Sequence, residues 1–250
     1  MYRRNFLKVF GAATVGLGTG TASSAAWAGL TLAPIESGSL SPQRRIRSCK
    51  IIGIGGTGFR LMCAFLSGFE KLPAHISAEV VCIGCGLENM SQDEAFALTA
   101  QHRVPVKTIS LSPYGAGSRV DLGRLSALRH LELLKSAVTG ADAVMLVAGL
   151  GGGTGSGVAP MMARLARSAG ATTAAAVNLP FDWEGKRRSR NANVAVKYLQ
   201  REGALVKQFS NEELLKITGD DITQEDFFDA QNQRIAACIH AFLEKENYLG

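Results

Sequence analysis

The stretch that decides the fold is GLGGGTGSG, residues 149–157, which directly follows the apolar run AVMLVA at residues 143–148. Six of its nine positions are glycine, and Thr154 and Ser156 stand among them. The apolar run is typical of a buried strand, and residues 158–170 have the composition of a helix. Because glycine lacks a Cβ, successive backbone N–H groups can turn toward an anion, and the start of a helix adds its dipole. The stretch therefore predicts a main-chain cradle for phosphate.

A second glycine loop, GIGGTG at residues 53–58, also stands between a strand-like and a helix-like run. Taken alone, the pattern GxGxxG favours a dinucleotide site, with Glu88 as the acidic residue that such a site needs. The dinucleotide pattern does not account for the second glycine loop after a later strand, however. Neither loop is a Walker P-loop, because neither ends in GK[ST]. One glycine-rich loop by itself could be only a tightly packed turn. Two such loops at the ends of adjacent strands favour a site that binds phosphate without a lysine.

Strand-like and helix-like runs alternate from Lys50 onward. Strands are expected at residues 50–54, 78–84, 104–110, 141–148, 171–180 and 204–210, and helices at 59–69, 121–138, 158–170, 192–202 and 224–245. The leucines of 121–138 recur at helical spacing, which predicts an amphipathic helix: Leu122, Leu125, Leu128, Leu131 and Leu134. The alternation predicts an α/β fold with a doubly wound, mostly parallel sheet, in which ligands bind at the carboxyl ends of the strands.

The charge of the chain is concentrated near its N-terminus. The 250 residues include 27 Lys and Arg against 21 Asp and Glu, and residues 1–50 hold seven of the former and one of the latter. The remaining 200 residues are therefore neutral, which argues against a nucleic-acid partner. Five cysteines are too few for a disulfide scaffold, and Cys82 and Cys85 have no second CxxC to complete a zinc site.

The first residues have the features of a targeting segment. Residues 1–28 contain Arg3-Arg4 followed by NFLK, a weakly apolar stretch, and the small-x-small sequence AWA. They resemble a twin-arginine (Tat) signal and predict export to the periplasm, with the cytoplasm as the alternative if the signal is not used. Residues 29–47 are expected to be a linker, and residues 48–250 one domain. Membrane contact is expected only through the N-terminal segment.

The glycine loops resemble those of the tubulin/FtsZ family of GTPases, whose signature is GGGTG(S/T)G. NLPFDWEGKRR at 178–188 is similar to the family's segment after the following strand, and YGAGS at 114–118 to its third phosphate loop. SNEELLK at 210–216 resembles a strand end near the nucleotide, and DFFDAQNQRIAACI at 226–239 the start of the long central helix. The resemblance covers residues 50–245 and implies a three-layer, Rossmann-like domain that binds GTP or GDP with Mg²⁺.

The resemblance also assigns roles to single residues. The phosphate-binding positions would be Gly55, Gly56, Thr57, Gly58, Gly115, Ala116, Gly117, Gly151, Gly152, Gly153, Thr154, Gly155, Ser156 and Gly157. Glu88 would lie near the γ-phosphate and Mg²⁺. Glu184 and Arg188 would stand beside the ribose and phosphate, and their spacing of four lets both reach one ligand. Arg187 and Arg190 are expected to be surface charge. The base-reading positions fall on Asn211, Asn232 and Gln233.

Two departures from the family pattern bear on function. Gln233 stands where the family has an acid, and an amide offers guanine one acceptor and a competing donor, so the base preference stays open. In FtsZ filaments an acidic loop after the central helix enters the neighbouring subunit's nucleotide site, and here the sequence stops at Gly250. We therefore expect a truncated FtsZ-like protein with weak or no hydrolysis of its own, which caps or modulates filaments of a full-length FtsZ-like protein or forms homo-oligomers.

Two other functions stay open on the sequence. One is an exported structural or interaction domain on the same fold that has lost nucleotide binding, which a working export signal would favour. The other is a NAD-binding oxidoreductase, which rests on GIGGTG alone because no catalytic His, Lys and Tyr set accompanies it. A role in bacterial cell division would follow only by analogy with the family.

Overall fold

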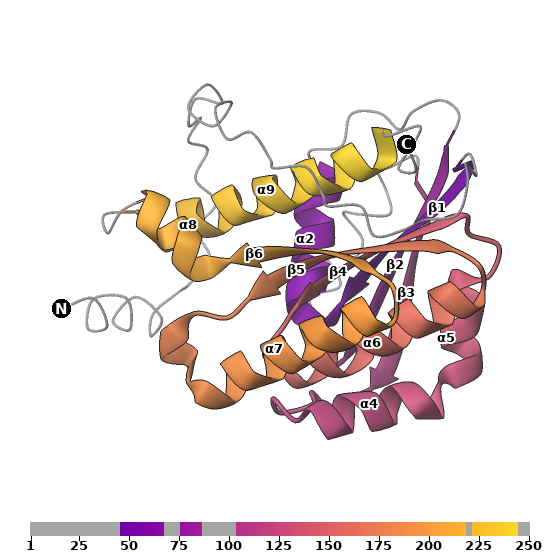
Figure 1. Cartoon of the computed structure of the whole chain (residues 1–250), viewed down its shortest axis with the longest axis horizontal. Helices are drawn as coiled ribbons and strands as arrows, with labels where there is room; N and C mark the ends of the chain where they lie inside the picture. The colour runs from indigo at the N-terminus through magenta and orange to yellow at the C-terminus, as the bar shows by residue number, and fades with distance from the viewer. Residues whose placement is uncertain (1–45, 68–75, 87–103, 219–221, 245–250) are drawn as a thin grey trace. The chain divides into compact units, whose positions relative to one another are not determined.

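The computed structural model describes residues 46–67, 76–86, 104–218 and 222–244 (Figure 1). The chain divides into two units, residues 1–39 and 40–250, and every described residue belongs to the second. The predicted signal segment 1–28 lies outside the described residues, and so do the linker up to residue 45 and Glu88.

A single parallel sheet runs through the described domain. Its strands are β1 (Ser48–Ile54), β2 (Ser77–Cys85), β3 (Val106–Ser112), β4 (Ala143–Gly149), β5 (Thr172–Leu179) and β6 (Leu205–Ser210). They pair in the order β3-β2-β1-β4-β5-β6, and every neighbouring pair is parallel. The strand order reverses direction at β1 and β4, which is the doubly wound arrangement, so the predicted fold class is confirmed.

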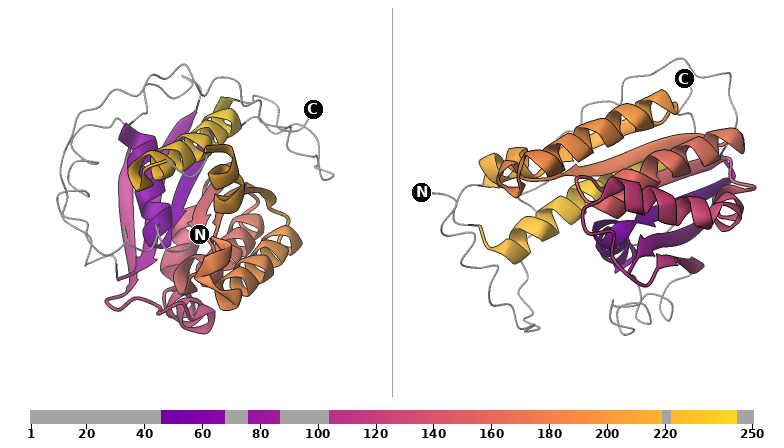
Figure 2. Two further views of the ribbon diagram at one scale, coloured as in Figure 1. Left: turned by 90° about the vertical axis from the view of Figure 1, so that its left-hand side faces the viewer. Right: turned by 90° about the horizontal axis from the view of Figure 1, so that it is seen from below.

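Helices cover both faces of this sheet (Figures 1 and 2). One face carries α4 (Val120–Arg129), α5 (Leu131–Val138), α6 (Gly153–Ser168) and α7 (Lys186–Arg201), and the other carries α2 (Gly55–Ser67) and α9 (Gln224–Glu244). The short helices η3 (Asp182–Glu184) and α8 (Asn211–Thr218) follow β5 and β6. The predicted three layers are confirmed. None of the described helices is both long enough and apolar enough to cross a membrane.

The central strand shows why continuous apolar runs become strands here. In β4 every residue from Ala143 to Ala148 is buried. Val144, Leu146 and Ala148 face the core beneath α6, whereas Ala143, Met145 and Val147 face the core beneath α2 and α9. Because successive side chains point to opposite faces and both faces are covered, a strand in this position needs apolar residues throughout.

Two helices begin earlier than their composition predicts. α2 starts at Gly55 and α6 at Gly153, so each helix takes its first turn from its glycine loop. Glycine has a low helix propensity, and this hides the helix start from a reading of composition. The close backbone contacts that these glycines allow with neighbouring elements outweigh their low helix propensity.

The predicted amphipathic helix 121–138 was wrong in two respects. It is broken at His130 into α4 and α5, and Leu122, Leu125 and Leu128 are 38–50% exposed. A spacing of three residues turns only about 300° around a helix, so the leucines drift off a single face. α4 instead buries its small residues Gly123 and Ala127.

Candidate functional site

Three loops meet at the carboxyl edge of the sheet: the first loop (55–58), the second loop (149–157) and the third loop (114–118). A Cβ built on Gly55 would lie 3.5 Å from the Thr154 Cβ, and one on Gly149 would lie 2.6 Å from the Thr57 Cβ. A Cβ on Gly153 would lie 2.7 Å from the Ala116 Cβ. The first and third loops therefore both contact the second, and the sequence motifs come together as expected.

Two groups stand out among the glycines of these loops. In the first group a Cβ would collide with backbone: at Gly155 it would lie 2.1 Å from the carbonyl oxygen of Gly149, and at Gly58 it would lie 2.6 Å from that of Val147. In the second group a Cβ would meet nothing within 4 Å, and its members are Gly56, Gly115, Gly117 and Gly152. The first group lets helices and strands pack closely, while the second leaves backbone bordering open space in all three loops.

The same loops carry backbone donors without partners. α6 begins after Gly152 with no side-chain cap, so its first N–H groups have no acceptor within the helix. Among the described residues, no hydrogen bond is made by the N–H groups of Gly152, Gly115, Ala116 and Gly117. Unpaired N–H groups at the start of α6 and in the third loop favour binding of an anion.

Ser156 takes part in shaping the second loop. Its side chain is buried, and its Oγ accepts a hydrogen bond of 2.8 Å from the N–H of Gly151. The preceding residue is fixed to the sheet, because the N–H of Leu150 donates to the carbonyl of Asn178 at 2.8 Å. Gly151 has a φ of 98°, which a residue with a side chain rarely adopts. The loop is therefore held by its own contacts.

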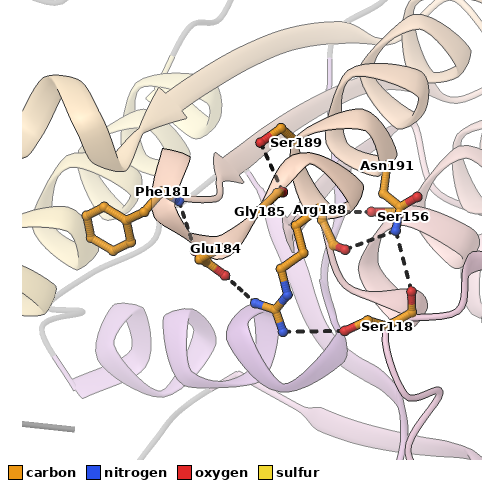
Figure 3. A network of polar contacts seen from close by, with 9 residues as sticks. Ser118, Ser156, Phe181, Glu184, Gly185, Arg188, Ser189 and Asn191 are labelled. Carbon is orange, nitrogen blue, oxygen red and sulfur yellow. Dashed lines mark hydrogen bonds and ion pairs between the residues drawn. The ribbon is translucent and has the colours of Figure 1, made fainter. Parts of the chain in front are cut away.

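Glu184 and Arg188 form the expected pair at the start of α7 (Figure 3). The Arg188 guanidinium donates through Nη1 to Glu184 Oε2, and through Nη2 to the Ser118 Oγ at 3.4 Å. The other oxygen of Glu184 accepts from the N–H of Phe181 at 2.8 Å. The pair thus joins the turn after β5 to the third loop.

Asn191 is a site residue that the sequence did not reveal. Its Nδ2 donates to the carbonyl oxygens of Gly151 at 3.2 Å and Ser118 at 3.4 Å, so one amide holds the second and third loops together (Figure 3). Arg187 acts similarly, since its Nη2 donates to the carbonyls of Gly117 and Ser118 at 3.2 Å each. Arg187 is exposed, as expected of surface charge, but its contact with the third loop was not predicted. An Asn directly after the basic run 186–190 was the available signal.

Arg190 lies away from the loops, on an exposed part of α7. It borders a surface groove of about 550 Å³ whose lining residues are Asp182, Lys186, Ser189, Arg190, Asn193, Val194 and Lys197. No salt bridge is formed by Arg190, Lys186 or Lys197 with the described residues. The expectation of solvated charge fits Arg190.

The predicted base-reading residues lie at the end of β6 and on α9. Asn211 is buried at the start of α8, and its Oδ1 accepts from the Nε2 of Gln231 at 3.1 Å. Asn232 is half-buried and Gln233 is exposed on α9. Gln231 itself is 1% exposed and was not predicted, although its position four residues after Phe227 and four before Ile235 places a polar residue in an apolar stripe.

Three of the five cysteines lie in the core, and Cys63 and Cys85 are half-buried. Burial raises the pKa of the Cys49 and Cys82 thiols to about 12 and that of Cys238 to about 11, so all three are neutral at physiological pH. In the part of the chain that the structure describes, no three His, Cys, Asp or Glu side chains are grouped to hold a metal ion. A metal at this site would take its ligands mainly from phosphate and water, as Mg²⁺ commonly does.

The chain matches the model of the Tubulin/FtsZ family, GTPase domain, over residues 48–219, which include all three loops. The chain belongs to the tubulin/FtsZ family. Among its relatives, the cell division protein FtsZ of Magnetospirillum gryphiswaldense is 33% identical over 192 residues, covering 75% of this chain and 32% of that protein. FtsZ of Buchnera aphidicola subsp. Schizaphis graminum is 39% identical over 130 residues, covering 52% of this chain and 34% of that protein. The chain thus spans about a third of the length of these relatives.

Solved structures of the tubulin/FtsZ family show the same fold. An empty FtsZ dimer from M. jannaschii has a TM-score of 0.64 at 25% identity, covering 83% of this chain and 57% of that one. A GTPγS-bound protofilament of CetZ2 from Haloferax volcanii has a TM-score of 0.59 at 25% identity, and the match covers 78% of this chain and 58% of that one.

Proposed function

We propose that this tubulin/FtsZ-family domain binds GTP and GDP between its three loops. The observation that carries the proposal is that three loops in mutual contact at the carboxyl edge of the sheet carry glycines with open space at their Cβ positions, and two of these loops carry unpaired N–H groups. The GTPγS-bound CetZ2 relative supports guanine nucleotide as the ligand.

The site would hold phosphate through its backbone. α2 and α6 direct the positive ends of their dipoles toward the loops from which they start, which stabilises negative charge without a lysine. Mg²⁺ would bind with the nucleotide through phosphate oxygens and water. The base would extend toward Asn211 at the start of α8 and toward Asn232 and Gln233 in the first half of α9.

We also propose that the domain hydrolyses GTP slowly by itself and modulates filaments of an FtsZ-type partner. The carboxylates of Glu184 and Asp121 border the second and third loops, and each is paired with an arginine, which leaves neither free to orient water. These two carboxylates of the described residues are thus engaged, and we propose that a partner subunit supplies the group that orients water. The solved relatives include a dimer and a protofilament, which supports an association of this kind.

Calorimetric titration with GTP, GDP, ATP and NAD tests the proposal. We expect binding of both guanine nucleotides and no binding of NAD. Gly152→Asp would add a carboxylate to the open space and should abolish binding, whereas Ser168→Asp adds the same charge at the far end of α6 and should not. Absence of heat with GTP and GDP at millimolar concentration would refute the proposal and favour a domain that has lost nucleotide binding.

A further inference from the structure

Gln231 lies at the centre of a buried network of amides. It projects from α9 onto the carboxyl end of the sheet, and its Nε2 donates to Asn178 Oδ1 at 2.6 Å and to Asn211 Oδ1 at 3.1 Å. The carbonyl of Phe209 lies at 3.5 Å from the same nitrogen. On its other side, Gln231 Oε1 accepts from the Nη1 of Arg234 at 3.3 Å. Each polar atom of the Gln231 side chain therefore has a partner.

The network adjoins the glycine loops. Asn178 stands near the end of β5, and its carbonyl is the group that accepts from the N–H of Leu150 in the second loop. Asn211 directly follows β6, the neighbouring strand. Both asparagines thus lie at the sheet edge where the loops meet, in contact with Gln231 of α9.

The chemistry of a primary amide fixes the orientation of Asn211. The NH₂ group of Gln231 carries two hydrogens, and the oxygens of Asn178 and Asn211 lie closest to it. When the oxygen of each asparagine faces Gln231, its own NH₂ group must face away. The Nδ2 of Asn211 has no hydrogen-bond partner among the described residues, although the residue is only 5% exposed.

We propose that Gln231 is a positioning residue that presents the NH₂ group of Asn211 to the nucleobase. The inference rests on the proposed nucleotide binding and adds the base preference to it. A fixed donor selects a purine that carries an acceptor, such as the O6 of guanine, over one that carries the N6 amino group of adenine. A donor held by Gln231 supplies discrimination that an exposed Gln233, with its freely rotating amide, does not.

Gln231→Glu changes the hydrogen bonding of this residue while keeping its shape. Arg234 faces the position of the new carboxylate and favours its ionised form, which only accepts hydrogen bonds. Asn178 and Asn211 would then rotate their amides to donate to it, so that Asn211 presents its Oδ1 to the base. The preference for GTP over 2,6-diaminopurine riboside triphosphate, which has an amino group in place of O6, should fall about tenfold or more.

Two further variants separate this role from a structural one. Gln231→Met keeps the volume but removes both donors, so Asn211 is free to adopt either orientation and the preference between the two nucleotides should decline without inverting. Gln200→Glu makes the same amide-to-carboxylate change on the exposed surface of α7 and should leave the preference unchanged. A purely structural role would lower the affinity for both nucleotides equally, and an unchanged ratio in Gln231→Glu would overturn the proposal.

Hydrogen exchange of side-chain amides tests the orientation without nucleotide. NMR of the ¹⁵N-labelled protein should show a protected NH₂ group for Gln231 and a rapidly exchanging one for Asn211, with Asn211 becoming protected in Gln231→Glu. A protected Asn211 NH₂ group in the wild-type protein would overturn the inference. If the wild-type protein binds no purine nucleotide, the proposed function fails by itself, and the exchange result still decides how Asn211 is oriented.

Discussion

Gly155→Ala should separate close packing from ligand contact in the second loop. The added Cβ would lie 2.1 Å from the carbonyl oxygen of Gly149, about 1 Å closer than real Cβ contacts allow. The backbone fixes the position of a Cβ and the oxygen belongs to the backbone, so no side-chain rotation can relieve the contact. α6 would have to move away from the end of β4, and with it the first turn that carries the unpaired N–H groups.

The magnitude follows from two opposing effects. Alanine is favoured over glycine in a helix interior by about 1 kcal/mol, which acts to stabilise the variant. Overpacking against rigid backbone costs roughly 1–3 kcal/mol or more, and here the shift would also disturb the contacts of Gly153 and Gly157 with the region around α4. We expect a net loss of about 2–3 kcal/mol in the free energy of unfolding.

Urea unfolding followed by circular dichroism measures this loss, with Gly152→Ala as the matched control. Gly152 has a φ of −78° and nothing within 4 Å of its Cβ position, so alanine should lower stability by less than about 1 kcal/mol. The methyl group would instead narrow the open space and weaken GTP binding about tenfold. Equal urea midpoints for Gly155→Ala and the wild type would refute the packing argument.

Three further predictions concern other parts of the chain. Asn191→Ala removes the amide that joins the second and third loops and should weaken GTP binding about tenfold by calorimetry, with little change in the urea midpoint. Glu79 has a pKa below its ordinary value: burial acts to raise it, but hydrogen bonds and ion pairs with Lys107 and Lys50 outweigh that effect. Glu79→Gln should therefore lower the free energy of unfolding by about 1 kcal/mol at pH 7. This difference from the wild type should disappear as the pH falls below 4.5, because Glu79 of the wild type then becomes protonated. A difference in stability that persists at that pH would contradict the ion-pair account. Residues 1–40 fused to a reporter that is active only after export should give activity that is lost when both arginines of the RR pair are changed to lysine, and an inactive fusion would argue against the export prediction.

The sequence predicted the sheet well because a doubly covered parallel strand has a simple requirement. All six expected strands overlap the observed ones, since a continuous apolar run such as 143–148 has no alternative place to bury both of its faces. Helix limits were harder to predict. α7 begins at Lys186 rather than at residue 192, because a basic first turn gives no apolar periodicity to detect.

The sequence predicted which loops form the site, but it did not predict which atoms of these loops are in contact. Glycine looks the same in a sequence whether a Cβ would meet open space, as at Gly152, or a carbonyl oxygen, as at Gly155. Likewise, the leucines of α4 outweigh its small residues in any count of hydrophobicity, yet Gly123 and Ala127 make the buried contact. Both outcomes depend on how closely two backbones approach, and that distance is a property of the assembled fold.

This close approach also explains why the loops suit a polyphosphate. A Cβ on Gly123 would lie 2.4 Å from the carbonyl oxygen of Gly153, and one on Gly157 would lie 2.6 Å from that of Val120, so α4 and α6 are in backbone contact at the first turn of α6. Donors fixed by backbone contacts need no reorganisation when a ligand binds, whereas a lysine would lose side-chain entropy. Rigidity of the cradle therefore comes from glycines that face away from the open space, and substitutions there should impair binding through stability, before any ligand contact is changed.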